Sequence, residues 1–182
     1  SDIAAIYPNY EYSDSMATAK PTHKADIVDG TFGFDGAGIE VAILEDSRIE
    51  FNNPYLITGT TRVPGDPNVD QHATATAGMV ASQHSTLQGI AQGALLFSAN
   101  GTSYSSANIS AAMDWSASTQ GNDVINNSWG GNDGVTTLNV HDMHLDYIVR
   151  HVYPTVTVAA GNEGTGSGRV SSPARAFNVI SV

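Results

Sequence analysis

The chain has 182 residues, of which 41% are apolar, and its 18 acidic and 7 basic side chains give a formal net charge of -11. This length and apolar share predict one globular domain with a buried core. The negative charge repels phosphate backbones and anionic lipids, so we expect neither nucleic acid nor membrane as a partner. No run approaches the ~20 apolar residues of a spanning helix, which predicts a soluble protein.

The chain contains no cysteine. Disulfides, thiolate metal sites and a cysteine nucleophile are therefore excluded. Only 14% of the residues are charged, and the segments between apolar runs are rich in Ser, Thr, Asn and Gly. This composition favours an extracellular, secreted protein of bacterial type.

Polar, mixed residues without a sustained period occupy positions 1–30. They predict an N-terminal arm that packs over the edge of a domain spanning 31–182. Within that domain short apolar runs alternate with helical patterns. We expect strands at 39–44, 94–98, 124–127, 155–160 and 179–182, and helices at 72–82, 105–118 and 137–152. This alternation is typical of an α/β fold, here a doubly wound parallel sheet with helices on both faces.

Two histidines, His141 and His144, lie on the flank of the apolar stripe of the third predicted helix. Their i, i+3 spacing suits a metal ion, but no carboxylate or third histidine completes a recognisable site. We therefore expect solvated surface histidines and no metal site.

The residues that directly follow the predicted strands carry the chemistry. In a doubly wound sheet, ligands bind at the carboxyl ends of the strands. Those positions hold Glu45-Asp46, Asn100-Gly101, 128–131 and Gly161-Asn162, and His72 opens the first predicted helix. Acyl transfer by a serine nucleophile needs a general base, a carboxylate that orients the base, and an amide donor for the oxyanion. Every part except the nucleophile is present.

Six segments carry a family resemblance: 36–54, 70–78, 89–94, 123–131, 159–164 and 172–182. Residues 70–78 are similar to a His-Gly-Thr-His-Val-Ala-Gly helix, and residues 159–164 match an Ala-Ala-Gly-Asn-Glu-Gly turn. The order and the spacings agree as well, which makes the match specific. Over about residues 24–182 the chain thus resembles the N-terminal portion of the catalytic domain of the subtilisin-like serine protease family, the subtilases.

The resemblance implies a serine endopeptidase with an acid–His–Ser triad in that chain order. His72 would be the general base, and Asn162 would donate its amide to the oxyanion. Two residues compete for the acid role. Counting along the first strand without a gap selects Glu45, whereas the spacing to Pro54 selects Asp46. We favour Asp46 and keep Glu45 open.

The resemblance also implies two cleft edges, between which a peptide or protein substrate adds as an extended strand. The residues of these two edges would be Gly101, Thr102 and Ser103 on one side, and Ser128, Trp129 and Gly130 on the other. Ala160 and Gly161, together with Asn162, would wall the primary specificity pocket. Small residues there leave room for a large apolar side chain.

The family's Gly-Thr-Ser-Met/Ala-x-Pro segment, which bears the nucleophile and follows the last predicted strand, does not occur in this sequence. The apolar run 179–182 closes the sequence without a cap, so we expect the nucleophile beyond Val182 and an inactive fragment. The C-terminal part of the same protein is then a candidate partner. The alternative is a non-catalytic subtilase-like module that binds peptides or partners. We expect no cofactor; the resemblance allows calcium, but we identify no site for it.

Overall fold

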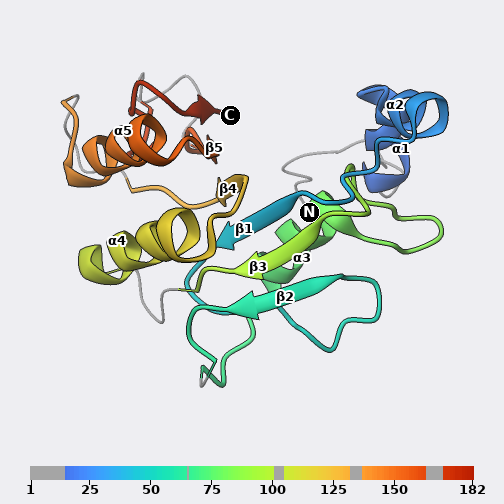
Figure 1. Cartoon of the computed structure of the whole chain (residues 1–182), viewed down its shortest axis with the longest axis horizontal. Helices are drawn as coiled ribbons and strands as arrows, with labels where there is room; N and C mark the ends of the chain where they lie inside the picture. The colour runs from blue at the N-terminus through green and yellow to red at the C-terminus, as the bar shows by residue number, and fades with distance from the viewer. Residues whose placement is uncertain (1–14, 65, 101–104, 132–136, 163–169) are drawn as a thin grey trace, which may run out of the picture.

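The computed structural model describes residues 15–64, 66–100, 105–131, 137–162 and 170–182. Its six strands form one parallel sheet in the order β2-β3-β1-β4-β5-β6 (Figure 1). The strands are β1 (Glu40–Leu44), β2 (Thr58–Thr61), β3 (Leu95–Ser98), β4 (Val124–Asn127), β5 (Thr155–Val158) and β6 (Ile180–Ser181). The helices are α1 (Ser15–Thr22), α2 (Ala25–Phe32), α3 (Gln71–Ala81), α4 (Ser106–Asp114) and α5 (Val140–Val152), and the π-helical turn η1 (Trp115–Gln120) continues α4.

Both faces of the sheet are buried, because side chains alternate between the faces along each strand. In β1, Ala42 and Leu44 belong to the core cluster that α4 and α5 complete. Val41 and Ile43 belong to the second cluster, which includes the buried alanines of α3. The predicted doubly wound fold with helices on both faces is therefore confirmed.

Helix α5 begins at Val140, three residues later than its pattern predicts, because Asn139 caps it. The Asn139 side chain accepts hydrogen bonds from the backbone N–H groups of His141 (2.9 Å) and Asp142 (3.3 Å). In return the Asp142 carboxylate accepts the Asn139 N–H at 2.8 Å. This reciprocal cap stabilises the helix start and fixes its place beside the sheet.

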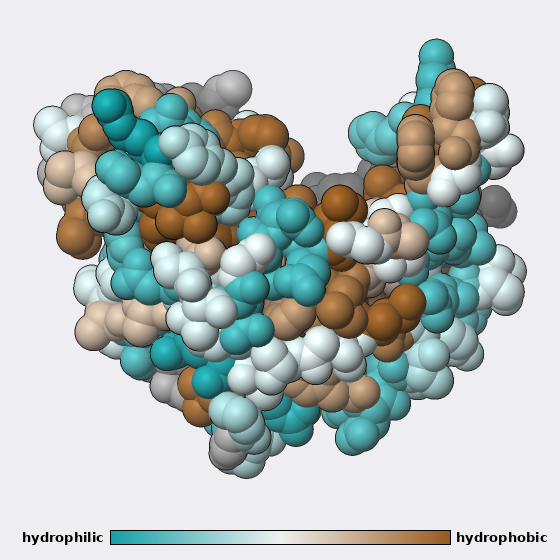
Figure 2. All heavy atoms as spheres, in the orientation of Figure 1, coloured by the Kyte–Doolittle hydropathy of each residue, from teal (hydrophilic) through white to brown (hydrophobic). Residues whose placement is uncertain are grey.

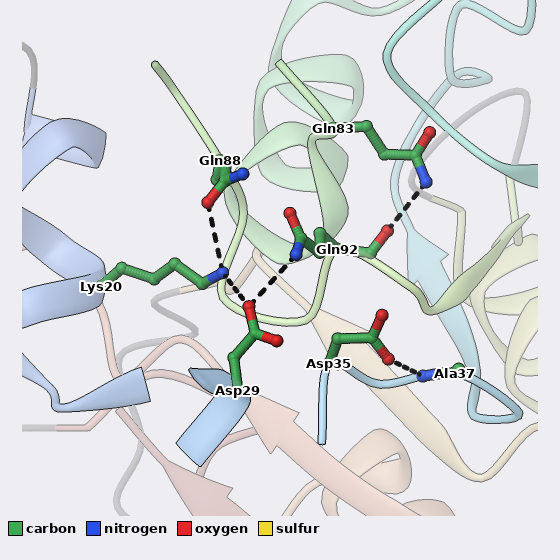
Figure 3. Close-up of polar contacts among 7 residues, drawn as sticks. All are labelled: Lys20, Asp29, Asp35, Ala37, Gln83, Gln88 and Gln92. Atoms are coloured by element: carbon green, nitrogen blue, oxygen red, sulfur yellow. Dashed lines mark hydrogen bonds and ion pairs between the residues drawn. The ribbon is translucent and has the colours of Figure 1, made fainter. Parts of the chain in front are cut away.

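Within residues 15–32 the structure has two helices, α1 and α2, which the sequence pattern did not predict. The buried ammonium of Lys20 joins them by an ion pair with Asp29 (2.9 Å) and also lies 3.4 Å from the Gln88 amide oxygen (Figure 3). Gln92 donates to the same Asp29 carboxylate at 3.1 Å. In Figure 2 the helices α1 and α2 project from one end of the molecule, and a notch separates them from the end that carries α5. Each helix has only eight residues, Pro21 lies inside α1, and α2 buries no side chain, so neither has the long buried apolar stripe that predicts a helix from sequence.

Strand β2 was also missed, because Thr58-Gly59-Thr60-Thr61 contains no apolar side chain. It pairs with β3 alone and forms the edge of the sheet. An edge strand that is half solvated needs no apolar run. None of the helices in the described part of the chain is long and apolar enough to cross a membrane.

Leu145 tests the packing of α5 on the sheet, because its side chain is completely buried. We expect Leu145→Ala to lower the free energy of unfolding by about 2–5 kcal/mol, the cost of lost apolar burial and a residual cavity. Met143→Ala is the matched control, since Met143 lies on the same helix and is 54% exposed. It should change the value by less than about 0.5 kcal/mol. Urea denaturation measures both, and equal effects would contradict the assigned faces of α5.

Candidate active site

The carboxyl ends of the central strands meet at one edge of the sheet, where parallel α/β folds bind ligands. Ile43 of β1 is in register with Ser98 of β3, and Leu44 is in register with Asn127 of β4. Asn127 in turn is in register with Val158 of β5. The residues that follow β1, β3, β4 and β5 are thus neighbours, although 115 positions separate Leu44 from Ala159.

His72 enters this edge from the first turn of α3. Asp70 is the N-cap of the helix, and its carboxylate accepts the backbone N–H of His72 at 2.8 Å. The backbone N–H of Asp70 donates to the Arg48 carbonyl at 3.0 Å, which ties the helix start to the loop after β1. The His72 side chain is 60% exposed. A fixed backbone and an open imidazole are what a general base requires.

Glu45 is the acidic partner of His72 in the structure. Its Oε1 atom lies 3.0 Å from His72 Nδ1, and its side chain is only 1% exposed. A proton on Nδ1 that is donated to the carboxylate leaves Nε2 as the basic nitrogen. The pair therefore has the arrangement in which a buried acid orients a histidine base.

Asp46, the acid that the motif spacing favours, is not the residue that meets His72. Glu45 lies two and four residues after Ile43 and Val41, whose side chains face α3, so the strand alternation places it on that same face. Asp46 lies two and four residues after Leu44 and Ala42, whose side chains face α4 and α5. A one-residue shift at a strand end turns a side chain to the opposite face. The alternation of side chains along β1 is thus the sequence signal that selects Glu45, whereas the spacing to Pro54 selects Asp46.

A pocket of about 690 Å³ opens beside the acid–base pair. Its lining residues are His72, Ile109, Ser128, Trp129, Gly130, Gly131, Asn139, His141, Asn162 and Ser172. The structure thus brings together five residues that the sequence predicts for the site: His72, Ser128, Trp129, Gly130 and Asn162. The predicted edge residues Gly101, Thr102 and Ser103 lie outside the described residues.

The remaining predicted wall residues, Ala160 and Gly161, lie next to the pocket in sequence but do not line it. Ala160 is held on both sides, because its N–H donates to the Val182 carbonyl (2.7 Å) and its carbonyl accepts the Ser171 N–H (2.9 Å). Gly161 adopts a φ of 112°, which L side chains rarely adopt. These two residues set the direction from which Asn162 enters the pocket.

Gly130 marks the place where two segments approach closely. A Cβ atom at this position would lie 3.2 Å from the Ser171 Cβ and 3.3 Å from the Ser172 carbonyl oxygen. The neighbouring Gly131 exchanges two backbone hydrogen bonds with Ser172, of 2.9 and 3.3 Å. The segment after β4 is therefore packed against residues 171–172, and the pocket wall has a fixed shape.

The prediction that His141 is a solvated surface residue is wrong. Its side chain lines the pocket, and the residue is only 8% exposed. Its ring stands edge-on to Trp129, with 5.9 Å between ring centroids. His144 lies elsewhere on the helix, where Nε2 contacts the Asp114 carboxylate at 2.8 Å. The apolar stripe did not identify His141 as buried, because a histidine does not contribute to such a stripe.

Asn100, which also follows a strand, has a structural role in the described part of the chain. Its fully buried amide donates to Asp66 (2.9 Å) and accepts from Thr61 (2.6 Å), and its carbonyl accepts the Arg62 Nε–H at 2.9 Å. Partial burial lowers the pKa of Arg62 below its ordinary value. These contacts anchor the loop between β2 and α3 and leave the pocket to other residues.

Three side chains could hold a metal ion among the described residues. Glu45, Asp70 and His72 offer ligand atoms within 4.8 Å of one another. The same three side chains already form the acid–base pair and the cap of α3. A cation there would compete with the Glu45–His72 contact. The calcium that the family resemblance allows remains without an assigned site.

The chain belongs to the subtilase family, whose model matches residues 13–182. It is 28% identical over 160 residues to alkaline elastase YaB of Bacillus sp. (strain YaB), covering 82% of this chain and 40% of that protein. It is also 28% identical over 160 residues to subtilisin Savinase of Lederbergia lenta, covering 82% and 56%.

Solved structures agree on the fold. The prenylagaramide maturation protease PagA superposes with a TM-score of 0.66 at 21% identity, covering 85% of this chain and 57% of that one. A lanthipeptide protease superposes with a TM-score of 0.64 at 22% identity, covering 92% and 53%. The chain thus spans about half the length of the proteins that it matches.

Proposed function

We propose that the whole protein is a serine endopeptidase in which Glu45, His72 and a serine outside this sequence form the triad. The observation that carries the proposal is the 3.0 Å contact between the buried Glu45 carboxylate and His72 Nδ1, at a pocket that Asn162 also lines. Membership of the subtilase family supports the reaction class.

In the first half of the reaction, His72 Nε2 takes the proton of the serine hydroxyl while the oxygen attacks the peptide carbonyl. The tetrahedral intermediate places its negative oxygen where the Asn162 amide donates a hydrogen bond. Collapse breaks the C–N bond, and His72 returns its proton to the leaving amine. Water then repeats the sequence on the acyl-enzyme, which releases the acid and restores the serine.

Glu45 has a specific electrostatic task. The N-terminus of α3 carries partial positive charge, which disfavours a protonated His72 in its first turn. The reaction passes through that imidazolium twice. A buried carboxylate at Nδ1 offsets the helix charge and also fixes the tautomer.

The substrate would bind as an extended strand along Ser128, Trp129 and Gly130. The rigid packing of this segment against residues 171–172 supports a preformed edge. Gly101, Thr102 and Ser103 remain the proposed opposite edge, with Ala160 and Gly161 behind the pocket. An extended-strand edge of this kind suits peptides or unfolded protein segments as substrates.

The position of the nucleophile, the partner that completes the site and the compartment also belong to the proposal. The relatives are longer than the matched region, which supports a nucleophile beyond Val182 and a fragment that is inactive alone. The C-terminal part of the protein would then complete the site. Extracellular action fits the low share of charged residues, 14%, and the segments rich in Ser, Thr, Asn and Gly.

Cleavage of a denatured protein substrate by the full-length protein tests the function. We expect internal cleavage, detected by mass spectrometry, that a sulfonyl fluoride abolishes. Binding of the same protein substrate without cleavage would instead establish the alternative, a non-catalytic subtilase-like module that binds peptides or partners.

Asn162→Ala tests the oxyanion role. We expect kcat to fall by about 10²–10³, the size known for one such donor in a subtilisin, because the hydrogen bond forms with the charge that develops in the transition state. KM should change little, since the ground-state carbonyl gains less from the donor. Steady-state kinetics on a fluorogenic peptide measures both constants. A raised KM at unchanged kcat would assign Asn162 to substrate binding alone.

A further inference from the structure

Arg48 lies where the segment after β1 meets the segment before α3, the two elements that carry the acid–base pair. Arg48 and Val69 form an isolated parallel bridge, and the Arg48 carbonyl accepts the Asp70 N–H at 3.0 Å. Glu45 comes three residues before this bridge, and His72 comes three residues after it. The separation of the two segments at Arg48 therefore controls the contact between Glu45 and His72.

The Arg48 side chain strengthens this junction. Its guanidinium donates two hydrogen bonds, from Nε to the Asp66 carbonyl at 2.9 Å and from Nη1 to the Ile49 carbonyl at 3.3 Å. Asp66 is 5% exposed and Ile49 is completely buried. Hydrogen bonds from a charged donor are the strong ones, and a buried acceptor that loses its donor destabilises the fold. One side chain thus joins a carbonyl of each segment.

Both carbonyls belong to residues that are fixed to the rest of the fold. The Ile49 N–H donates to the Ser98 hydroxyl of β3 at 3.1 Å. The Asp66 carboxylate accepts the Asn68 N–H and the Asn100 amide, each at 2.9 Å. A side chain that is locked between anchored groups in this way preserves the geometry of a site.

A second link limits the effect that we expect from losing Arg48. The Glu50 N–H donates to the Thr74 hydroxyl at 3.0 Å, and that hydroxyl donates to the Asp70 carbonyl at 2.8 Å. Without the guanidinium, the start of α3 would stay attached to the loop after β1 but would be free to shift. A misplacement of about 1 Å in a catalytic group costs about 10² in rate.

We propose that Arg48 is a positioning residue, which holds the start of α3 against the end of β1 and so keeps His72 Nδ1 at 3.0 Å from Glu45 Oε1. This inference rests on the proposed peptidase function. Arg48 is not among the described residues that line the pocket, so it acts through the acid–base pair and not on the substrate. Its planar guanidinium bonds two carbonyls in a fixed geometry, which a lysine ammonium does not reproduce.

In the full-length protein, Arg48→Met should lower kcat by about tenfold to 10², because it removes both hydrogen bonds and keeps a long unbranched side chain. KM should stay within about twofold, since the acid–base pair acts on the transition state. Arg48→Lys keeps the charge but not the fork, so its kcat should lie between the values of the wild type and of Arg48→Met. Arg150→Met, which removes an exposed arginine of α5, is the control and should leave both constants within about twofold.

A double-mutant cycle with Glu45→Gln separates positioning from general stabilisation. Once Glu45→Gln has impaired the contact with His72, Arg48→Met should lower kcat by less than about twofold. An equal fold-change in both backgrounds, or an unchanged kcat in folded Arg48→Met, would overturn the inference and leave the peptidase function intact. If Arg48→Met does not fold, Arg48→Lys enters the same cycle under the same two criteria. Absence of all cleavage by the wild-type protein would overturn both the peptidase function and the inference.

Discussion

Replacing His72 by alanine should lower kcat of the full-length protein by about 10⁶, the largest loss that we expect from any single substitution. The side chain accepts the serine proton and returns it to the leaving amine, so both halves of the reaction lose their proton carrier. KM should stay near its wild-type value, because the exposed imidazole contributes little to binding the peptide backbone. Single-turnover and steady-state kinetics on one fluorogenic peptide measure the two constants.

His144→Ala is the matched control for this prediction. His144 has the same side chain but contacts Asp114 away from the pocket, so its removal should leave kcat within about twofold. Circular dichroism must show that both variants are folded. A His72→Ala variant that keeps a tenth or more of wild-type kcat would exclude His72 as the general base.

Glu45→Gln should lower kcat/KM by about 10³–10⁴, while Asp46→Asn should lower it by less than about tenfold. The glutamine amide has nearly the same shape as the carboxylate but carries no charge, and its NH₂ group favours the wrong tautomer of His72. Asp46 lacks this contact, although one of its carboxylate oxygens is buried without a hydrogen-bond partner among the described residues.

The pair of variants separates the two acids that the sequence leaves open. Glu45→Asp adds a finer test, because shortening the side chain by one methylene lengthens the 3.0 Å contact to His72 Nδ1. The kcat/KM of Glu45→Asp should lie between the values of the wild type and of Glu45→Gln. The opposite order, a large loss in Asp46→Asn and a near-normal Glu45→Gln, would return the acid role to Asp46.

The features that the sequence predicted well are those with regular patterns. Apolar runs located β1, β3, β4 and β5 within about two residues, since buried parallel strands need apolar side chains on both faces. Short motifs located Trp129 and Asn162 after strands and His72 at the start of α3, and all three line one pocket. Motifs succeed here because the carboxyl ends of parallel strands meet in space.

Other features depend on tertiary contacts that leave no periodic trace in the sequence. The α1–α2 pair is joined by the buried Lys20 and its contacts with Asp29 and Gln88. The burial of His141 follows from the packing of α5 against Trp129. The choice between Glu45 and Asp46 depended on one residue of strand alternation, a boundary that a motif spacing does not resolve.

Labelling of the full-length protein by a fluorophosphonate, with the modified residue identified by peptide mapping, tests whether Glu45 and His72 activate a serine nucleophile. We expect one modified serine, in sequence that follows Val182, and loss of that modification in both His72→Ala and Glu45→Gln. A folded wild-type protein that does not react, or one whose serine reacts equally in the absence of His72, would contradict a triad built on Glu45 and His72.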